Sequence, residues 1–300
     1  MPAPVIAGVD GSAESLAAAE WAAREAALRN RPLHLIHVWD WHPRPHDGEP
    51  ANAAQRHLAM RALRQAEDRI RDAVPELRPT EEQVEGPATT ALLKAAERAD
   101  LLVLGSRGLT GLAGLLVGSV ALGVVARATV PVVLVRAADP ADGECRPADD
   151  GSARPRTDRR DVVLGLDVKE ACDEVIRFAF EAAALRRTRL RVVHAWQPPS
   201  VLGLGPGDIA LVDDPCRADE WRGFTSAVLQ VWRDKYPGVE VLETVVRGKA
   251  TTALKRAASG SGLLVVGRRI TGRPALARTG PTTHAVIHHV GCPVAVVPHH

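Results

Sequence analysis

Short apolar runs alternate with longer segments of helical spacing through the first half of this 300-residue chain. The first run, Val5 to Val9, is followed by Asp10-Gly11-Ser12, in which the serine is placed to cap a helix. The helix expected next, at 13–29, carries apolar residues three and four positions apart. The same alternation predicts a strand at 33–39, a helix at 51–74, a strand at 81–84, a helix at 89–98, a strand at 101–104, a helix at 120–128 and a strand at 132–135. Strands that alternate with helices of this length predict a parallel sheet covered by helices on both faces.

The pattern begins again after residue 160. VVLGLD at 162–167 resembles VIAGVD at 5–10, an offset of 157 residues that persists from Trp39 to Trp196. From Gly86 and Gly248 onward the offset is 162 residues, with the five extra residues expected in the Pro/Gly-rich segment 197–215. The sequence therefore predicts a tandem duplication of one α/β unit, with domains at 1–137 and 161–300. Residues 138–160 are rich in Asp, Pro, Gly and Arg and predict a linker.

Composition excludes several classes of protein. The formal net charge is +2, from 38 basic and 36 acidic residues, so a dedicated nucleic-acid binder is not expected. The four cysteines are scattered without a C-x-x-C pair, which favours unpaired thiols in a reducing, cytoplasmic location. The uncharged stretch 108–126 approaches membrane-spanning length, but its counterpart in the second repeat carries Arg273, Arg278 and His284. We therefore expect neither a signal peptide nor a membrane segment.

The segment GSRGLTGLAGLLVGS, residues 105–119, lies between a predicted strand and the next helix. Gly105 allows the chain to turn off the strand, and Gly108 and Gly118 allow the backbone to approach a phosphate closely. Ser119 adds a hydroxyl at the start of a helix whose N–H groups and dipole favour anions, and Arg107 could supply a cation. The alternative is a glycine-rich crossover without a ligand. Neither the Walker loop nor the dinucleotide G-x-G-x-x-G motif is present.

Two further candidate residues end neighbouring strands. If the sheet reverses direction between its first and fourth strands, Asp10 faces the same crevice as the glycine segment, and its carboxylate could bind a sugar hydroxyl or an amine. The alternative role of Asp10 is to form the turn that caps the first helix. Val38 would offer backbone groups to a base edge, whereas His37 and His194 are expected in the core.

Together these motifs are similar to those of the universal stress protein family. The resemblance covers both repeats and rests on GVDGS after strand one, His-x-Trp at the end of strand two, Gly-x-x-Gly-x9-Gly-Ser after strand four, and the Pro-Val-Val of strand five. It implies two tandem Rossmann-like units of the adenine-nucleotide α-hydrolase-like type, each a five-stranded parallel sheet of order 3-2-1-4-5.

The resemblance also implies a ligand and a mode of assembly. In its ATP-binding members, the residues matching Asp10 and Val38 contact the adenosine, and those matching Gly105, Gly108, Gly118, Ser119 and Val120 contact the phosphates. ATP is therefore the expected cofactor, with the participation of Mg left open. Members of the family pair through strand five, which implies intrachain pairing of the two domains, and a homodimer of the tandem chain is expected.

The second repeat departs from this pattern. GVDGS becomes GLDVK, Ile270 replaces the second loop glycine, and Pro281 replaces the serine. A β-branched side chain narrows the phosphate path, and proline removes one helix N–H donor. The equivalent candidate residues are Asp167, Ala195, Gly267, Gly280 and Thr282, and the nearby arginines Arg268, Arg269, Arg273 and Arg278 leave a shifted anion site open. We expect nucleotide mainly in the first domain.

No recognisable spacing links a nucleophile to a base, and G-x-S-x-G is absent. His284 and His288, four residues apart on a predicted helix, are expected to be two exposed histidines rather than zinc ligands. We expect slow ATP hydrolysis or none, because no general base can be assigned. The leading hypothesis is a nucleotide-dependent stress-response or signalling module. The alternatives are a nucleotide-independent adapter that acts through dimerisation and surface contacts, and an enzyme such as a nucleotidyl transferase.

Overall fold

The computed structural model describes residues 2–39, 49–107, 117–137, 160–198, 216–270 and 279–300. Its contacts divide the chain into two compact units. The first contains residues 1–155 with the segments 268–279 and 293–298, and the second contains 156–267, 280–292 and 299–300. Apart from Arg160, the predicted linker lies outside the described residues. The domain boundaries drawn from the sequence remain a prediction.

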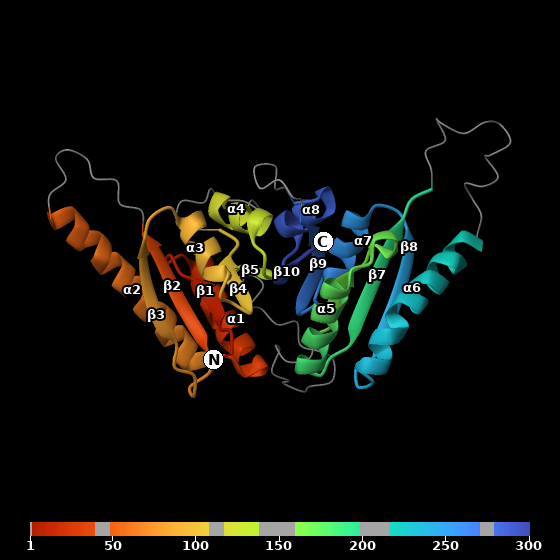
Figure 1. Cartoon of the computed structure of the whole chain (residues 1–300), viewed down its shortest axis with the longest axis horizontal. Coiled ribbons are helices and arrows are strands. Elements are labelled where there is room, and N and C mark those ends of the chain that lie inside the picture. The colour runs from red at the N-terminus through yellow and green to blue at the C-terminus, as the bar shows by residue number, and fades with distance from the viewer. Residues whose placement is uncertain (1, 40–48, 108–116, 138–159, 199–215, 271–278) are drawn as a thin grey trace, which may run out of the picture. The chain divides into compact units, whose positions relative to one another are not determined.

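The first unit is a parallel α/β sheet whose strands follow the order β3-β2-β1-β4-β5, as predicted. Helices α1 and α2 pack on one face of the sheet, and α3 and α4 pack on the other (Figure 1). The elements are β1 (Val5–Gly8), α1 (Ala13–Arg29), β2 (Leu33–Trp39), α2 (Glu49–Ala73), β3 (Thr80–Glu85), α3 (Ala88–Ala96), β4 (Leu101–Gly105), α4 (Ser119–Arg127) and β5 (Val132–Val135).

Local sequence explains how α1 is positioned. Ser12 caps the helix by accepting a hydrogen bond from the backbone N–H of Ser15 at 3.1 Å. The helix ends at Asn30, which adopts the left-handed conformation with φ 51°. Its buried face is mostly alanine, so the helix backbone can approach the sheet closely. The first turn of α1 is therefore fixed at the carboxyl ends of β1 and β4.

A strand from the end of the chain completes the first unit. β10 (Val294–His299) pairs antiparallel with β5, with Val294 opposite Leu134 and Val296 opposite Val132. Because β5 and β10 are the fifth strands of the two repeats, the intrachain strand pairing implied by the family resemblance is present. Arg268 belongs to the same unit and donates hydrogen bonds to the carbonyls of Ala126, at 3.0 Å, and Ala128.

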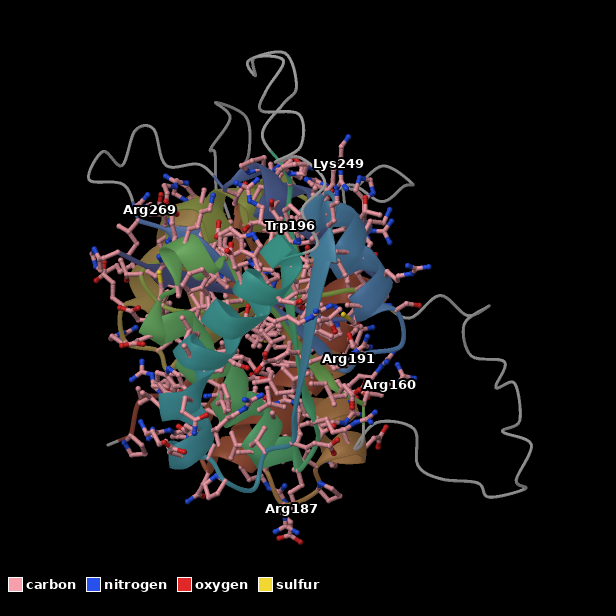
Figure 2. All side chains as sticks on the ribbon, turned by 90° about the vertical axis from the view of Figure 1, so that its right-hand side faces the viewer. Arg160, Arg187, Arg191, Trp196, Lys249 and Arg269 are labelled. Atoms are coloured by element: carbon pink, nitrogen blue, oxygen red, sulfur yellow. The ribbon has the colours of Figure 1, made fainter. Side chains whose placement is uncertain are left out.

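In the second unit the order β8-β7-β6-β9 corresponds to the repeat order 3-2-1-4, again parallel. Its elements are β6 (Val162–Gly165), the 3-10 helix η2 (Val168–Glu170), α5 (Asp173–Arg186), β7 (Leu190–Trp196), α6 (Cys216–Lys235), β8 (Val241–Arg247), α7 (Ala250–Ala258), β9 (Leu263–Arg269) and α8 (Pro281–His289). Figure 2 shows Trp196 and Lys249 at one end of this unit and Arg187 at the opposite end.

The core of the second unit differs from that of the first by its aromatic residues. Phe180 of α5 is fully buried, and its ring centroid lies 6.2 Å from that of Trp232 and 5.7 Å from that of Tyr236. The corresponding helix of the first unit buries alanine and serine instead. Aromatic side chains bury more area per residue and hold α6 further from the sheet. The duplicated units therefore keep their topology but not their packing.

Candidate functional site

The candidate site of the first unit lies where β1 and β4 end side by side. The two strands are parallel neighbours, with Gly8 opposite Leu104, so the residues that follow them leave the sheet at the same edge. The hydroxyl of Ser12, in the turn after β1, lies 3.5 Å from the backbone oxygen of Arg107, which follows β4. The structure therefore brings the Asp10 turn and the start of the glycine segment together.

Asp10 has the turn-forming role that the sequence left open as an alternative. One of its carboxylate oxygens accepts hydrogen bonds from the backbone N–H of Ser12 at 2.9 Å and from the Ser12 hydroxyl at 2.6 Å. The backbone N–H of Asp10 donates to the hydroxyl of Ser15 at 3.2 Å. Asp10 is only half-buried, so this role fixes the carboxylate without removing it from the crevice.

Gly105 has a structural role that sequence reasoning missed. A Cβ at this position would lie 2.8 Å from the backbone carbonyl carbon of Glu14 and 2.8 Å from the backbone nitrogen of Ser15. The absence of a side chain therefore lets the end of β4 contact the first turn of α1. This close approach also places the Glu14 side chain beside the residues that follow Gly105.

Two arginines and one carboxylate meet beside that contact. A guanidinium nitrogen of Arg107 lies 3.0 Å from a carboxylate oxygen of Glu14. Burial lowers the pKa of Arg136, at the end of β5, the positive charge of Arg107 lowers it further, and Glu14 opposes the shift. This cluster carries two positive charges and one negative charge, so it favours an anion at this edge of the sheet. Glu14 and Arg136 carry no motif that sequence reasoning could have found.

The helix α4 begins at the same edge. Gly118 is its N-cap, with φ −67° and ψ 154°, and no side chain accepts a hydrogen bond at this cap. The backbone N–H of Gly118 donates to the carbonyl of Ser106 at 2.8 Å, which ties the helix start to the end of β4. Ser119 and Val120 are exposed in the first turn. Because the first N–H groups of a helix lack intrahelical partners, this end suits an anion. Gly108 lies outside the described residues.

The neighbouring strand β2 contributes Val38, which pairs with Val84 and is half-buried. The ring of His37 contacts the backbone oxygen of Val9 through Nδ1 at 2.8 Å, so this nitrogen carries the proton. Burial lowers the pKa of His37. His37 is half-buried, whereas His194, its counterpart in the second repeat, is 3% exposed and lies in the core as expected.

The second repeat places its candidate residues differently. Asp167 caps η2 by accepting from the backbone N–H of Lys169 at 3.1 Å, a short helix that the sequence did not predict. The amine of Lys169 in turn lies 5.4 Å from the ring centroid of Trp221. Ala195 pairs with Val246 within the sheet. The turn that holds Asp10 in the first repeat is therefore replaced by a cation–π contact.

Its glycines face other groups as well. A Cβ on Gly267 would lie 3.0 Å from the ring of His299, so this ring occupies the space beside the strand end. Gly280 caps α8 with Pro281 as the first helical residue, and Thr282 is half-buried in the first turn. Ile270 ends the described part of this loop.

Two expectations about nearby side chains change. Arg268, grouped in the sequence with arginines that could bind an anion, is 5% exposed and hydrogen-bonded to backbone carbonyls. Of the two histidines expected to be exposed, His284 is exposed but His288 is buried, with ring centroids 4.5 Å apart. Both differences arise from tertiary packing that helical spacing does not encode. Among the described residues no group of three or more His, Cys, Asp or Glu could hold a metal ion. Within the same part of the chain, no helix is long and apolar enough to span a membrane.

Comparison with known proteins identifies relatives over the full chain. The profile of the Universal stress protein family matches residues 1–136 and 158–298. Universal stress protein Rv2623 of Mycobacterium tuberculosis is 36% identical, over 97% of this chain and 95% of its own. Universal stress protein Rv2005c of the same organism is 29% identical, over 97% and 96%.

Solved structures agree with the fold. A universal stress protein from Archaeoglobus fulgidus covers 98% of this chain and 96% of its own, with a TM-score of 0.67 and 19% identity. A universal stress protein solved in complex with cAMP matches 45% of this chain and 97% of its own at 32% identity, with a TM-score of 0.37.

Proposed function

Because the chain belongs to the universal stress protein family, we propose that its first repeat binds ATP and that the bound nucleotide controls a stress-response or signalling interaction. The observation that carries the proposal is the start of α4, a helix N-terminus without a side-chain cap, tied by Gly118 to the end of β4. A phosphate accepts hydrogen bonds from such N–H groups and is favoured by the helix dipole.

The surrounding residues fit the rest of a nucleotide. The cluster of Arg107, Arg136 and Glu14 has a net positive charge at the same edge, which suits a polyphosphate with or without Mg. Asp10 is held in a defined orientation by Ser12, and its carboxylate would accept from a ribose hydroxyl. Val38 would offer backbone groups to the base. The chain's own contribution is to orient and bind, since no general base has been assigned, and we expect slow hydrolysis or none.

The second repeat supports weaker binding or none. Proline at the first position of α8 removes one N–H donor, and the ring of His299 lies against Gly267. The hydroxyl of Thr283 donates to the carbonyl of Gly267 at 2.8 Å, so it is already engaged. We therefore assign nucleotide to the first repeat.

The test is to denature the purified full chain, measure the nucleotide released per chain, and titrate nucleotide-free protein with ATP. One nucleotide per chain, or a saturable ATP titration with a stoichiometry of one, supports the proposal. If no nucleotide is released and ATP changes neither the melting temperature nor the heat of mixing, the first repeat is not a nucleotide site. The chain would then act as an adapter through its surface.

A further inference from the structure

The second unit contains a thiol–imidazole pair that plays no part in the proposed nucleotide site. The sulfur of Cys172 lies 3.0 Å from Nδ1 of His299 and 3.0 Å from the backbone oxygen of Glu170. Cys172 is partly exposed and belongs to no disulfide. A small oxidant or alkylating agent can therefore reach a sulfur that is already in contact with a base.

Both members of the pair are specific to the second repeat. Cys172 follows Ser15 by the 157-residue offset, and His299 follows Ala137 by the 162-residue offset. In the first repeat, the Ser15 hydroxyl donates to the carbonyl of Ser12 at 3.0 Å and takes part in the turn at the start of α1. The duplicated scaffold therefore does not require a thiol or an imidazole at these positions.

The imidazole is held in place by its surroundings. His299 is 8% exposed, and its ring fits against Gly267, where a Cβ would lie 3.0 Å from Cδ2 and Nε2. Its Nδ1 also lies 3.3 Å from the backbone oxygen of His300. A ring so confined keeps one nitrogen beside the sulfur, which is the geometry needed for proton transfer between them.

The helix α5 adds to the effect on the sulfur. Cys172 is the N-cap of this 14-residue helix, and no side chain accepts a hydrogen bond at the cap. The positive end of the helix dipole stabilises a thiolate there. Three acidic side chains oppose it, Glu170, Asp173 and Glu174, but all three residues are exposed and screened by water. The buried imidazole is at contact distance, so its charge dominates over theirs.

We propose that Cys172 is an oxidation site, at which a peroxide converts the thiol to a sulfenic acid with His299 as the proton acceptor. The proton of the thiol passes to the imidazole, and the thiolate attacks one oxygen of hydrogen peroxide. An S–O bond forms as the O–O bond breaks, so sulfur loses two electrons and the peroxide gains them. The hydroxide that leaves takes the proton from the imidazolium and departs as water.

The test uses the full chain and follows each cysteine by mass spectrometry. Treatment with hydrogen peroxide in the presence of dimedone should label Cys172. Iodoacetamide should alkylate Cys172 at pH 6 about fivefold more slowly in His299→Gln than in the wild-type chain, allowing for the lower nucleophilicity of a more acidic thiol. Cys292 is the internal reference, since burial raises the pKa of its thiol, and its labelling should not change with the substitution. Cys172→Ser should abolish the dimedone adduct at this position.

The pH profile of the wild-type chain tests the proposal without a variant. The alkylation rate of Cys172 should reach half its maximum at a pH about one unit lower in the folded chain than in the same chain in urea. Equal profiles would overturn the proposal. So would a folded His299→Gln chain that is alkylated at the wild-type rate, or a peroxide-treated chain without the dimedone adduct on Cys172.

Discussion

Replacing Ser119 by glutamate separates anion binding from folding at the start of α4. Ser119 is the first residue of the helix, is exposed, and follows an N-cap without a side-chain hydrogen bond. A carboxylate at a helix N-terminus stabilises the helix by about 0.3–1 kcal/mol. The same carboxylate about 5 Å from one phosphate charge costs roughly 2–3 kcal/mol at an effective dielectric constant of 20 to 30. The variant should therefore be at least as stable as the wild-type chain but bind ATP some 30- to 150-fold more weakly.

The measurement pairs calorimetric titration with ATP and thermal unfolding of the same samples. Thr252→Glu is the matched control, because Thr252 is exposed in the first turn of α7, a helix that also has nine residues, no acidic residue in its first turn and no side-chain cap. The control should show the same small change in stability and unchanged ATP affinity. If Ser119→Glu binds ATP as tightly as the wild-type chain, the phosphates do not lie at the N-terminus of α4.

Three further substitutions test the packing and titration of the first unit. Gly105→Ala should lower the free energy of unfolding by at least about 1–3 kcal/mol, because its Cβ would lie 2.8 Å from backbone atoms of α1, and urea unfolding should show a smaller loss for Gly260→Ala, where φ is +74° but nothing lies within 4 Å. Glu25→Ala should cost about 3–5 kcal/mol in urea unfolding, since the carboxylate is 1% exposed and lies 2.6 Å from Nε of Arg29; an unchanged urea midpoint would show that this pair is not stabilising. The lowered pKa of His37 means that the unfolded chain binds a proton first as the pH falls through 6.5, so stability is present above 6.5 and is lost below it; His37→Gln should reduce this loss between pH 7.5 and pH 5, and an identical pH dependence would refute the assignment.

Sequence periodicity predicted most of the topology. The strand order of the first unit follows from the alternation of apolar runs and helical segments together with the family resemblance, and the duplication follows from two constant offsets. The capping role of Ser12 was also predictable, because an N-cap is a property of adjacent residues. These features depend on contacts that are close in sequence or repeated along it.

The site was predictable only in part. Asp10 and the start of α4 were identified from motifs, but the contact of Gly105 with α1 and the meeting of Glu14 with Arg107 depend on how two elements pack. The ring of His299 against Gly267 joins residues that no repeat or motif relates. Such contacts are set by tertiary packing, in which a single extra carbon decides which elements can touch.

The pairing of β5 with β10 has a consequence for synthesis of the chain. Every residue of β5 is buried in the complete protein, and β4 is its neighbour on the other side. While the ribosome makes the roughly 160 residues that separate the two strands, at about 5–20 residues per second, β5 remains an apolar sheet edge for some 10–30 s. Nascent chains on neighbouring ribosomes of one message present the same edge at the same time. Slowing translation of the second half should therefore increase aggregation of the first, in a polysome-dependent manner that a refolding experiment on the complete chain would not reveal.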